Sequence, residues 1–115
     1  MDYDFKVTKN KNIKVKDVLC KEHGRPLVYK FNEGALCDDL REYIDHTYYE
    51  HYSENKFQAT EFIMDGGHGE GFCIGNILKY AQRYGKKDGY NRKDLMKVLH
   101  YAIMALYVHD TEHEK

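Results

Sequence analysis

The chain has 115 residues, a formal net charge of −1 and 42% hydrophobic residues, which predicts a single domain with a modest core. A charge this close to zero excludes a global electrostatic attraction to DNA or to an anionic membrane, so we expect neither nucleic acid nor a membrane as a partner. No segment approaches the roughly 18 apolar residues that a membrane helix needs.

The chain has three cysteines, none with the C-x-x-C spacing of a zinc or redox site: Cys20, Cys37 and Cys73. An odd number of thiols without a metal-binding pattern is typical of a reducing compartment. The acidic N-terminal residues also lack the apolar region of a secretion signal. We therefore expect a cytoplasmic protein.

The aromatic composition is unusual, with eleven tyrosines and no tryptophan. A tyrosine buries its ring while its hydroxyl stays polar, so tyrosines suit semi-polar clefts and contacts between subunits; ordinary packing is the simpler alternative. Because a chain this short has little core and much amphipathic surface, we expect a homo-oligomer. The expected contact is the segment that holds Tyr43, Tyr48 and Tyr49.

The first 31 residues alternate between apolar and polar side chains in the manner of short strands. Three segments fit this pattern: 5–8, 13–16 and 27–31. We expect them to form a small two- or three-stranded β element or an extended arm. Since the rest of the chain has helical spacing, the predicted class is mainly α, with α+β character confined to the N-terminus.

Helices are predicted from the spacing of apolar residues in the remainder of the chain. The first follows residues 32–34 and runs to about Tyr49 or beyond. A shorter helix carries residues 59–63, and a glycine-rich loop at 65–71 follows it. That loop precedes a helix but is not a Walker A sequence, so a phosphate loop, a mobile lid and a plain connector all stay open.

Two further helices are predicted, one between Phe72 and Gly85 and one from Asn91 to about Val108. Glycine commonly follows the last turn of a helix, and asparagine is a favourable capping residue at the start. Because the connection is short, the two helices are expected to lie antiparallel as a C-terminal hairpin.

Each helix of this hairpin has an apolar and a polar face when its residues are placed 100° apart. The apolar face of the earlier helix, predicted to be core, holds Cys73, Ile74, Ile77, Leu78 and Ala81. Its polar face holds Asn76, Lys79 and Arg83. Gly75 lies beside this polar face, where the missing side chain permits close approach of a ligand, and Tyr80 lies at the border.

The last helix repeats this arrangement. Its predicted core face holds Leu95, Leu99, Ala102, Ile103 and Leu106. Its polar face holds Asp94, Lys97 and Tyr101. We expect the two polar faces to share one cleft, with Lys86 and Lys87 at its end; two ordinary solvated faces are the alternative.

A phosphate-bearing ligand suits these residue types. Lysine offers a point charge and arginine a two-pronged donor, while the start of the last helix presents free amides. Asn76 offers both a donor and an acceptor for a base or a sugar. Asp94 or Glu61 is the expected ligand of Mg²⁺, which commonly joins phosphate to protein through one or two carboxylates.

The segment from His51 to Tyr107 resembles a short phage domain, the SaV-like domain, which is often labelled phage nucleotide kinase. Its pattern F-x-x-G-N-x-x-K-Y-x-x-R-x-G-K-K is met here by FCIGNILKYAQRYGKK at 72–87. The matching positions in this string are Gly75, Asn76, Lys79, Tyr80, Arg83, Gly85, Lys86 and Lys87. The later positions that match are Asp94, Leu95, Lys97 and Tyr101, and Val98 replaces the usual alanine.

The resemblance implies a phage protein that acts in the bacterial cytoplasm and binds a nucleotide. It divides the chain into an N-terminal extension at 1–50 and a helical module at 51–107 within one domain. As a kinase, the protein would transfer phosphoryl to a (deoxy)nucleoside monophosphate, with Lys79, Arg83 and Asp94 as catalytic residues and Mg²⁺ as cofactor.

The resemblance also places His51 at the ligand. The alternatives are a non-catalytic binder that sequesters a nucleotide signal and a protein that inhibits a host protein through residues 1–50.

Overall fold

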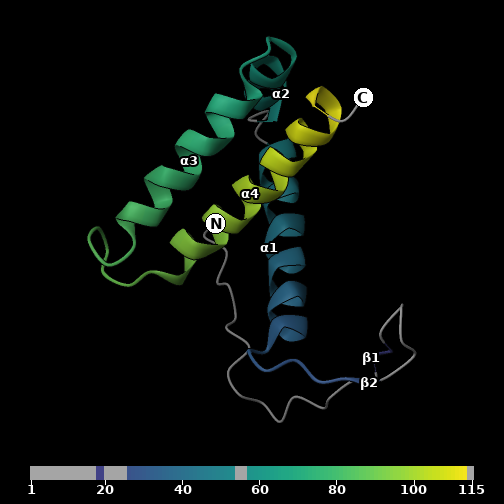
Figure 1. Cartoon of the computed structure of the whole chain (residues 1–115). Helices are drawn as coiled ribbons and strands as arrows, with labels where there is room; N and C mark the ends of the chain where they lie inside the picture. The colour runs from purple at the N-terminus through teal and green to yellow at the C-terminus, as the bar shows by residue number, and fades with distance from the viewer. Residues whose placement is uncertain (1–17, 20–25, 54–56, 114–115) are drawn as a thin grey trace.

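The computed structural model describes the backbone of residues 18–19, 26–53 and 57–113, and the side chains of residues 27–50 and 59–113. Its elements in chain order are β1 (Val18–Leu19), β2 (Pro26–Leu27), α1 (Glu33–Ser53), α2 (Phe57–Asp65), α3 (Gly69–Arg83) and α4 (Arg92–Glu112) (Figure 1). The mainly helical class predicted from the sequence is confirmed. None of the described helices combines the length and the apolar character that crossing a membrane requires.

The described β structure is a single antiparallel pair, β1 with β2, two residues long on each strand. Of the strand expected at 27–31 only Leu27 takes part, and the prediction is wrong for the remaining four residues. The Phe31 N–H donates a 2.7 Å hydrogen bond to Glu33 Oε1, so these residues lead into α1 instead. The other two expected strands lie outside the described residues: 5–8 and 13–16.

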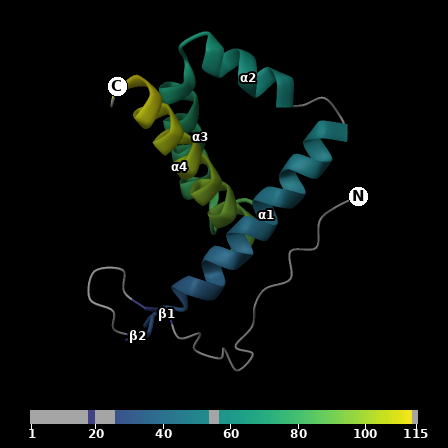
Figure 2. The same cartoon turned by 90° about the vertical axis from the view of Figure 1, so that its right-hand side faces the viewer.

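α1 forms where a helix was predicted and extends beyond Tyr49 to Ser53. Asn32 precedes it with a φ of 61°, a left-handed conformation that asparagine adopts more readily than most residues. Figure 2 shows α1 crossing α4 near the start of α4. At this crossing Arg92 Nη2 lies 3.0 Å from Asp39 Oδ2, and the Asp39 side chain is buried.

The glycine-rich segment is shorter as a loop than the sequence predicts. α3 begins at Gly69, three residues before Phe72, so the connection from α2 to α3 is only residues 66–68. A Cβ at position 69 would lie 2.7 Å from Met64 Sδ and 2.9 Å from Val108 Cγ2. This glycine therefore lets α2 and α4 approach α3 closely, and it serves packing rather than flexibility.

α3 and α4 lie side by side and run antiparallel, as Figures 1 and 2 both show, so the predicted hairpin forms. Gly85 turns the chain after α3 with a φ of 85°, and its N–H donates to the carbonyl of Gly89 at 2.9 Å. Asn91 caps α4, accepting the Lys93 N–H at 3.0 Å, and the helix runs four residues past the predicted Val108.

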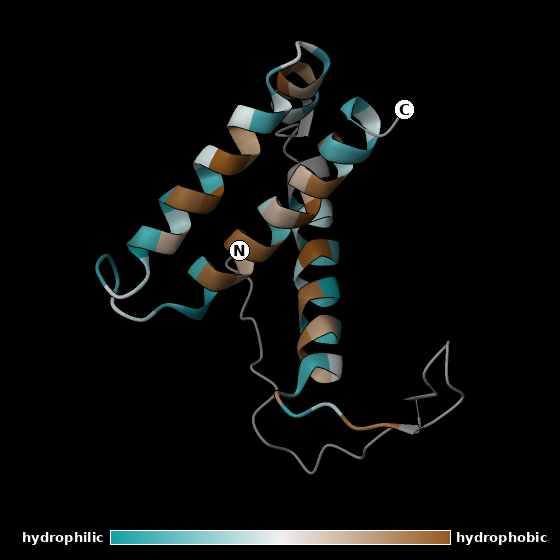
Figure 3. Ribbon diagram, in the orientation of Figure 1, coloured by the Kyte–Doolittle hydropathy of each residue, from teal (hydrophilic) through white to brown (hydrophobic). Residues whose placement is uncertain are grey.

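The side of the hairpin that is buried differs from the prediction. In the described part of the chain the buried hydrophobic residues are Cys73, Tyr80, Met96 and Val108. Most of the apolar residues predicted to be core are exposed: Ile74, Leu78, Ala81, Leu95, Leu99, Ile103 and Leu106. Figure 3 shows apolar bands that recur along both helices of the hairpin.

The physical reason is that α4 packs against two helices at once. α3 and α1 both contact it, and these contacts include its polar and aromatic residues Arg92, Lys97, His100 and Tyr101. Large aromatic rings bury area effectively while keeping polar tips, so a face rich in tyrosine and histidine can be a packing face. Hydropathy alone ranks the leucines higher and therefore selects the wrong face.

Candidate functional site

Three cations from two helices surround one buried tyrosine ring. Lys79 Nζ, Arg83 Cζ and Lys97 Nζ lie 5.0, 5.6 and 4.9 Å from the centre of the Tyr80 ring, which is 8% exposed. Lys79 and Arg83 come from α3 and Lys97 comes from α4. The structure thus brings together the charged residues of the two predicted polar faces.

The ring beneath these cations is half of an aromatic pair. Tyr80 stacks on Tyr101 with ring centres 6.0 Å apart and an interplanar angle of 8°. Phe72 packs edge-on against Tyr101, with the centres of the two rings 5.7 Å apart. Burial raises the pKa of the Tyr101 hydroxyl, and the neighbouring Tyr80 and Cys73 raise it further. Tyr101 therefore stays protonated at neutral pH and can donate a hydrogen bond.

The three cations have no anionic partner within the described residues: no carboxylate oxygen lies within ion-pair distance of Lys79, Arg83 or Lys97. A cation near an aromatic ring gains about 0.5–1 kcal/mol at an exposed site. Three positive charges around one ring without a carboxylate partner are also a suitable environment for an anion, which would neutralise them.

Asp94 adds a negative charge on the same side of α4. It precedes Lys97 by three residues and Tyr101 by seven, which places the three on one face of the helix. The residue is 5% exposed, and its Oδ2 atom is buried with no hydrogen-bond partner among the described residues. Buried carboxylate oxygens nearly always have a partner, so this atom is an acceptor available to a ligand donor or a metal ion.

Two residues of the predicted ligand set line α3 beside the cations. Asn76 donates from Nδ2 to the Phe72 carbonyl at 2.8 Å, which fixes its amide against the helix. Gly75 faces open space: a Cβ built there would meet no atom within 4 Å. Packing therefore does not require a glycine at this position.

The loop lysines belong to the same end of the hairpin. The backbone N–H groups of Lys86 and Lys87 both donate to the Arg83 carbonyl, at 2.9 and 3.2 Å. This anchors the loop to the end of α3, while both lysine side chains are exposed. The side chain of His51, the remaining predicted ligand residue, lies outside the described part.

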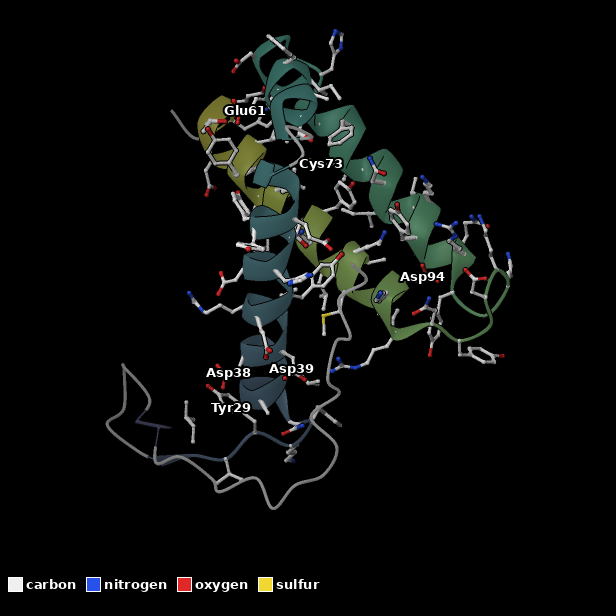
Figure 4. All side chains as sticks on the ribbon, turned by 180° about the vertical axis from the view of Figure 1, so that it is seen from behind. Tyr29, Asp38, Asp39, Glu61, Cys73 and Asp94 are labelled. Carbon is white, nitrogen blue, oxygen red and sulfur yellow. The ribbon has the colours of Figure 1, made fainter. Side chains whose placement is uncertain are left out.

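The two residues named for Mg²⁺ are far apart. Figure 4 shows Glu61 on α2 and Asp94 near the start of α4, towards opposite ends of the hairpin. One ion cannot contact both side chains. Asp94 is the one beside the cations, whereas Glu61 is exposed on α2.

A cluster of two glutamates and a histidine at the other end of the hairpin was not predicted from the sequence. Glu70, Glu112 and His113 bring one ligand atom each to within 4.8 Å of one another, and His113 Nε2 lies 3.7 Å from Glu70 Oε2. All three are exposed. The spacing along the chain gives no signal of this group, because its members come from the start of α3 and the end of α4.

The Asp39–Arg92 ion pair was also missed. Its partners are 53 residues apart, so no local pattern connects them. A second contact of the same crossing is Tyr43 with His100, whose ring centres lie 6.1 Å apart at nearly a right angle. Burial raises the pKa of Tyr43, partly offset by its hydrogen bond with Thr47.

Comparison with protein families finds one match, a family described as a protein of unknown function, DUF3310, over residues 46–103. This is just over half of the chain. The chain belongs to the DUF3310 family. The DUF3310 region starts within α1 and ends within α4, and its description states no activity. It contains Tyr80, Tyr101, the three cations around the Tyr80 ring and Asp94. Comparison with curated proteins and with solved structures finds no match.

Proposed function

We propose that this protein binds a phosphate-bearing small molecule, specifically a nucleotide, at the Tyr80 site. The residues of this site are Gly75, Asn76, Lys79, Tyr80, Arg83, Asp94, Lys97 and Tyr101. The observation that carries the proposal is the gathering of Lys79, Arg83 and Lys97 around one ring without a carboxylate partner in the described residues. A dianionic phosphate supplies the missing charge, and Arg83 offers it a planar pair of donors.

A nucleotide suits the site better than a simple anion because the cations do not stand alone. The orphan Oδ2 of Asp94 accepts a hydrogen bond from an amino or hydroxyl group, or binds Mg²⁺ that bridges to phosphate. The Tyr101 hydroxyl donates a further hydrogen bond. A ligand that carries phosphate together with base or sugar donors fulfils all of these requirements.

Phosphoryl transfer is a second step that the same residues allow. This reaction depends on positioning and on neutralising charge, so it needs no nucleophilic side chain. Lys79 and Arg83 would stabilise the transferred group, and Asp94 would hold Mg²⁺. The resemblance to phage nucleotide kinases supports this role, in a phage protein that acts in the host cytoplasm.

Binding without turnover is the alternative function. The chain contains no G-x-x-x-x-G-K-[ST] sequence, the usual phosphate loop of nucleotide kinases. A binder of this kind would sequester a nucleotide signal. The other alternative is a protein that binds no nucleotide and inhibits a host protein.

The test is calorimetry of the full chain against a panel of nucleoside mono-, di- and triphosphates, with and without Mg²⁺. Arg83→Ala should weaken binding roughly ten- to a hundredfold, because a charge-assisted contact contributes about 1.5–3 kcal/mol. Arg83→Lys should recover part of this loss, since a point charge lacks the planar fork. The melting temperature without ligand should change little.

Arg41→Ala is the matched control, because Arg41 is exposed on α1 and should leave affinity unchanged. Product formation from a triphosphate and a monophosphate distinguishes the kinase from the binder. If no nucleotide binds, or if Arg83→Ala lowers the melting temperature and leaves affinity intact, the site is structural and the proposal fails.

A further inference from the structure

α4 carries an apolar stripe that the described residues leave partly exposed. Leu95, Leu99, Ile103 and Leu106 are 42%, 45%, 43% and 62% exposed. They follow one another at steps of four, four and three, so they lie on one side of the helix. Single exposed leucines need no explanation, but a row of four on one helix marks a contact surface.

The spacing within this stripe is that of a coiled-coil seam. Leu95, Leu99, Ala102 and Leu106 alternate steps of four and three, as d and a positions of a heptad do. Ala102 is the small member, and a small residue lets a facing helix approach closely. The α4 stripe is therefore suited to a helical partner rather than to a flat surface.

Two helices already contact α4. α3 covers the side of Lys97 and Tyr101, and α1 crosses the start of α4 at Arg92, one end of the stripe's side, and packs near His100 (Figure 2). Only four hydrophobic residues are buried in the described part of the chain, which is few for a helical domain of this size. A further helix on this exposed side would bury the stripe and complete a bundle.

Charge indicates which helix completes it. Around the start of α4 the basic residues Lys86, Lys87, Arg92 and Lys93 outnumber the acidic Asp88 and Asp94, whereas the last turn carries Asp110 and Glu112 beside His109. A second α4 laid antiparallel brings the basic end of each copy to the acidic end of the other, whereas a parallel one opposes like charges.

The register supports the same orientation. An antiparallel partner centred between His100 and Tyr101 pairs Leu95 with Leu106 of the second copy, and Leu99 with Ala102 of the second copy. Both pairs place a d position opposite an a position, and the small alanine faces a leucine, so large and small side chains alternate. One two-fold axis therefore satisfies the whole seam.

We propose that the α4 stripe is a self-association surface on which α4 of a second copy lies antiparallel, completing a helical bundle across a two-fold axis. This interface differs from the tyrosine contact on α1 that the sequence suggests. It lies away from Lys97 and Tyr101, so association and ligand binding are separable properties.

The experiment measures the mass of the full chain by light scattering from micromolar to millimolar concentration. The wild type should have twice the 13.7 kDa of one chain. Leu99→Glu should be monomeric, because a charge at the centre of the seam is buried without a partner in the dimer. Leu106→Glu, at the most exposed position of the stripe, is the second variant and should also be monomeric.

Leu78→Glu is the control, since Leu78 is 63% exposed on α3 and lies off the stripe. It should stay dimeric, and circular dichroism should show the same helical content in all variants. A monomeric wild type, or a dimer that survives both glutamates on α4, overturns the proposal.

Orientation is tested by cross-linking in a background with Cys20→Ser and Cys37→Ser, where Cys73 stays buried. Mixing a Leu95→Cys chain with a Leu106→Cys chain should give a mixed disulfide dimer on oxidation. Leu95→Cys alone should cross-link poorly. Efficient cross-linking of Leu95→Cys to itself would show a parallel pair and overturn the antiparallel arrangement.

Discussion

α1 and α3 each contact α4 near a buried aspartate. One of the two carboxylates has an ion-pair partner, and the other has an oxygen without a hydrogen-bond partner among the described residues. At the α1 crossing, Asp39 is 5% exposed and Arg92 lies 3.0 Å away. On the side facing α3, Asp94 is equally buried, yet its Oδ2 atom has no partner among the described residues. Equal burial therefore does not mean equal pairing: the Asp39 carboxylate joins two helices, whereas the Oδ2 atom of Asp94 is left as an unused acceptor.

The strongest way to break this comparison is to remove the satisfied carboxylate. Asp39→Ala should lower the free energy of unfolding by about 2–3 kcal/mol, because the half-buried Arg92 loses its 3.0 Å ion pair with Asp39. Urea denaturation gives the value. Asp38→Ala is the matched control, since Asp38 is the exposed neighbour of Asp39 (Figure 4) and its loss should cost little. Equal effects of the two changes would show that the crossing does not depend on the ion pair.

Removing the charge of the unsatisfied carboxylate should have the opposite sign. Asp94→Asn should leave the free energy of unfolding unchanged or raise it by about 1 kcal/mol, because an unpaired buried charge is removed. Nucleotide binding in the presence of Mg²⁺ should fall. Measuring both quantities on one preparation separates the effects. A marked loss of stability would mean that Asp94 has a structural partner, and would remove it from the ligand site.

The smallest expected effect comes from adding one methyl group to α3 beside the cations, at Gly75. Gly75→Ala should stabilise the fold by about 0.5–1 kcal/mol, because alanine favours a helix and the new Cβ meets nothing within 4 Å. It should nevertheless weaken ligand binding several-fold if the ligand approaches this backbone. Gly71→Ala is the control, also helical and also open to solvent, and should stabilise the fold without changing affinity. Unchanged affinity in both variants would place the ligand elsewhere.

Local patterns were sufficient to predict the helices and the convergence of charges. Asn91 as a cap and Gly85 as a terminator depend on backbone chemistry within a few residues, and both are found where expected. The meeting of Lys79, Arg83 and Lys97 follows from helical periodicity and a short connection. Those features need no knowledge of the rest of the molecule.

Features that depend on a third element were not predictable. Which face of α4 is inside depends on how α1 crosses it, and the hydropathy of Leu99 or Leu106 contains no information about that crossing. Gly69 was taken as loop, although Met64 and Val108 require a glycine there because they press against it. The pairing of Asp39 with Arg92 likewise joins distant parts of the chain.

The buried Cys73 can report how often the hairpin opens. Its side chain is 0% exposed, so a thiol reagent reaches it only when α3 separates from its neighbours. Burial also raises the pKa of its thiol, which lowers its reactivity in the closed state. Cys37, exposed on α1, supplies the reference rate of an open thiol in the same molecule. The ratio of the two labelling rates is the fraction of time that the helices spend apart. If the proposed ligand binds Arg83 on α3 and Lys97 on α4, it should tie the two helices together and slow the labelling of Cys73 relative to Cys37.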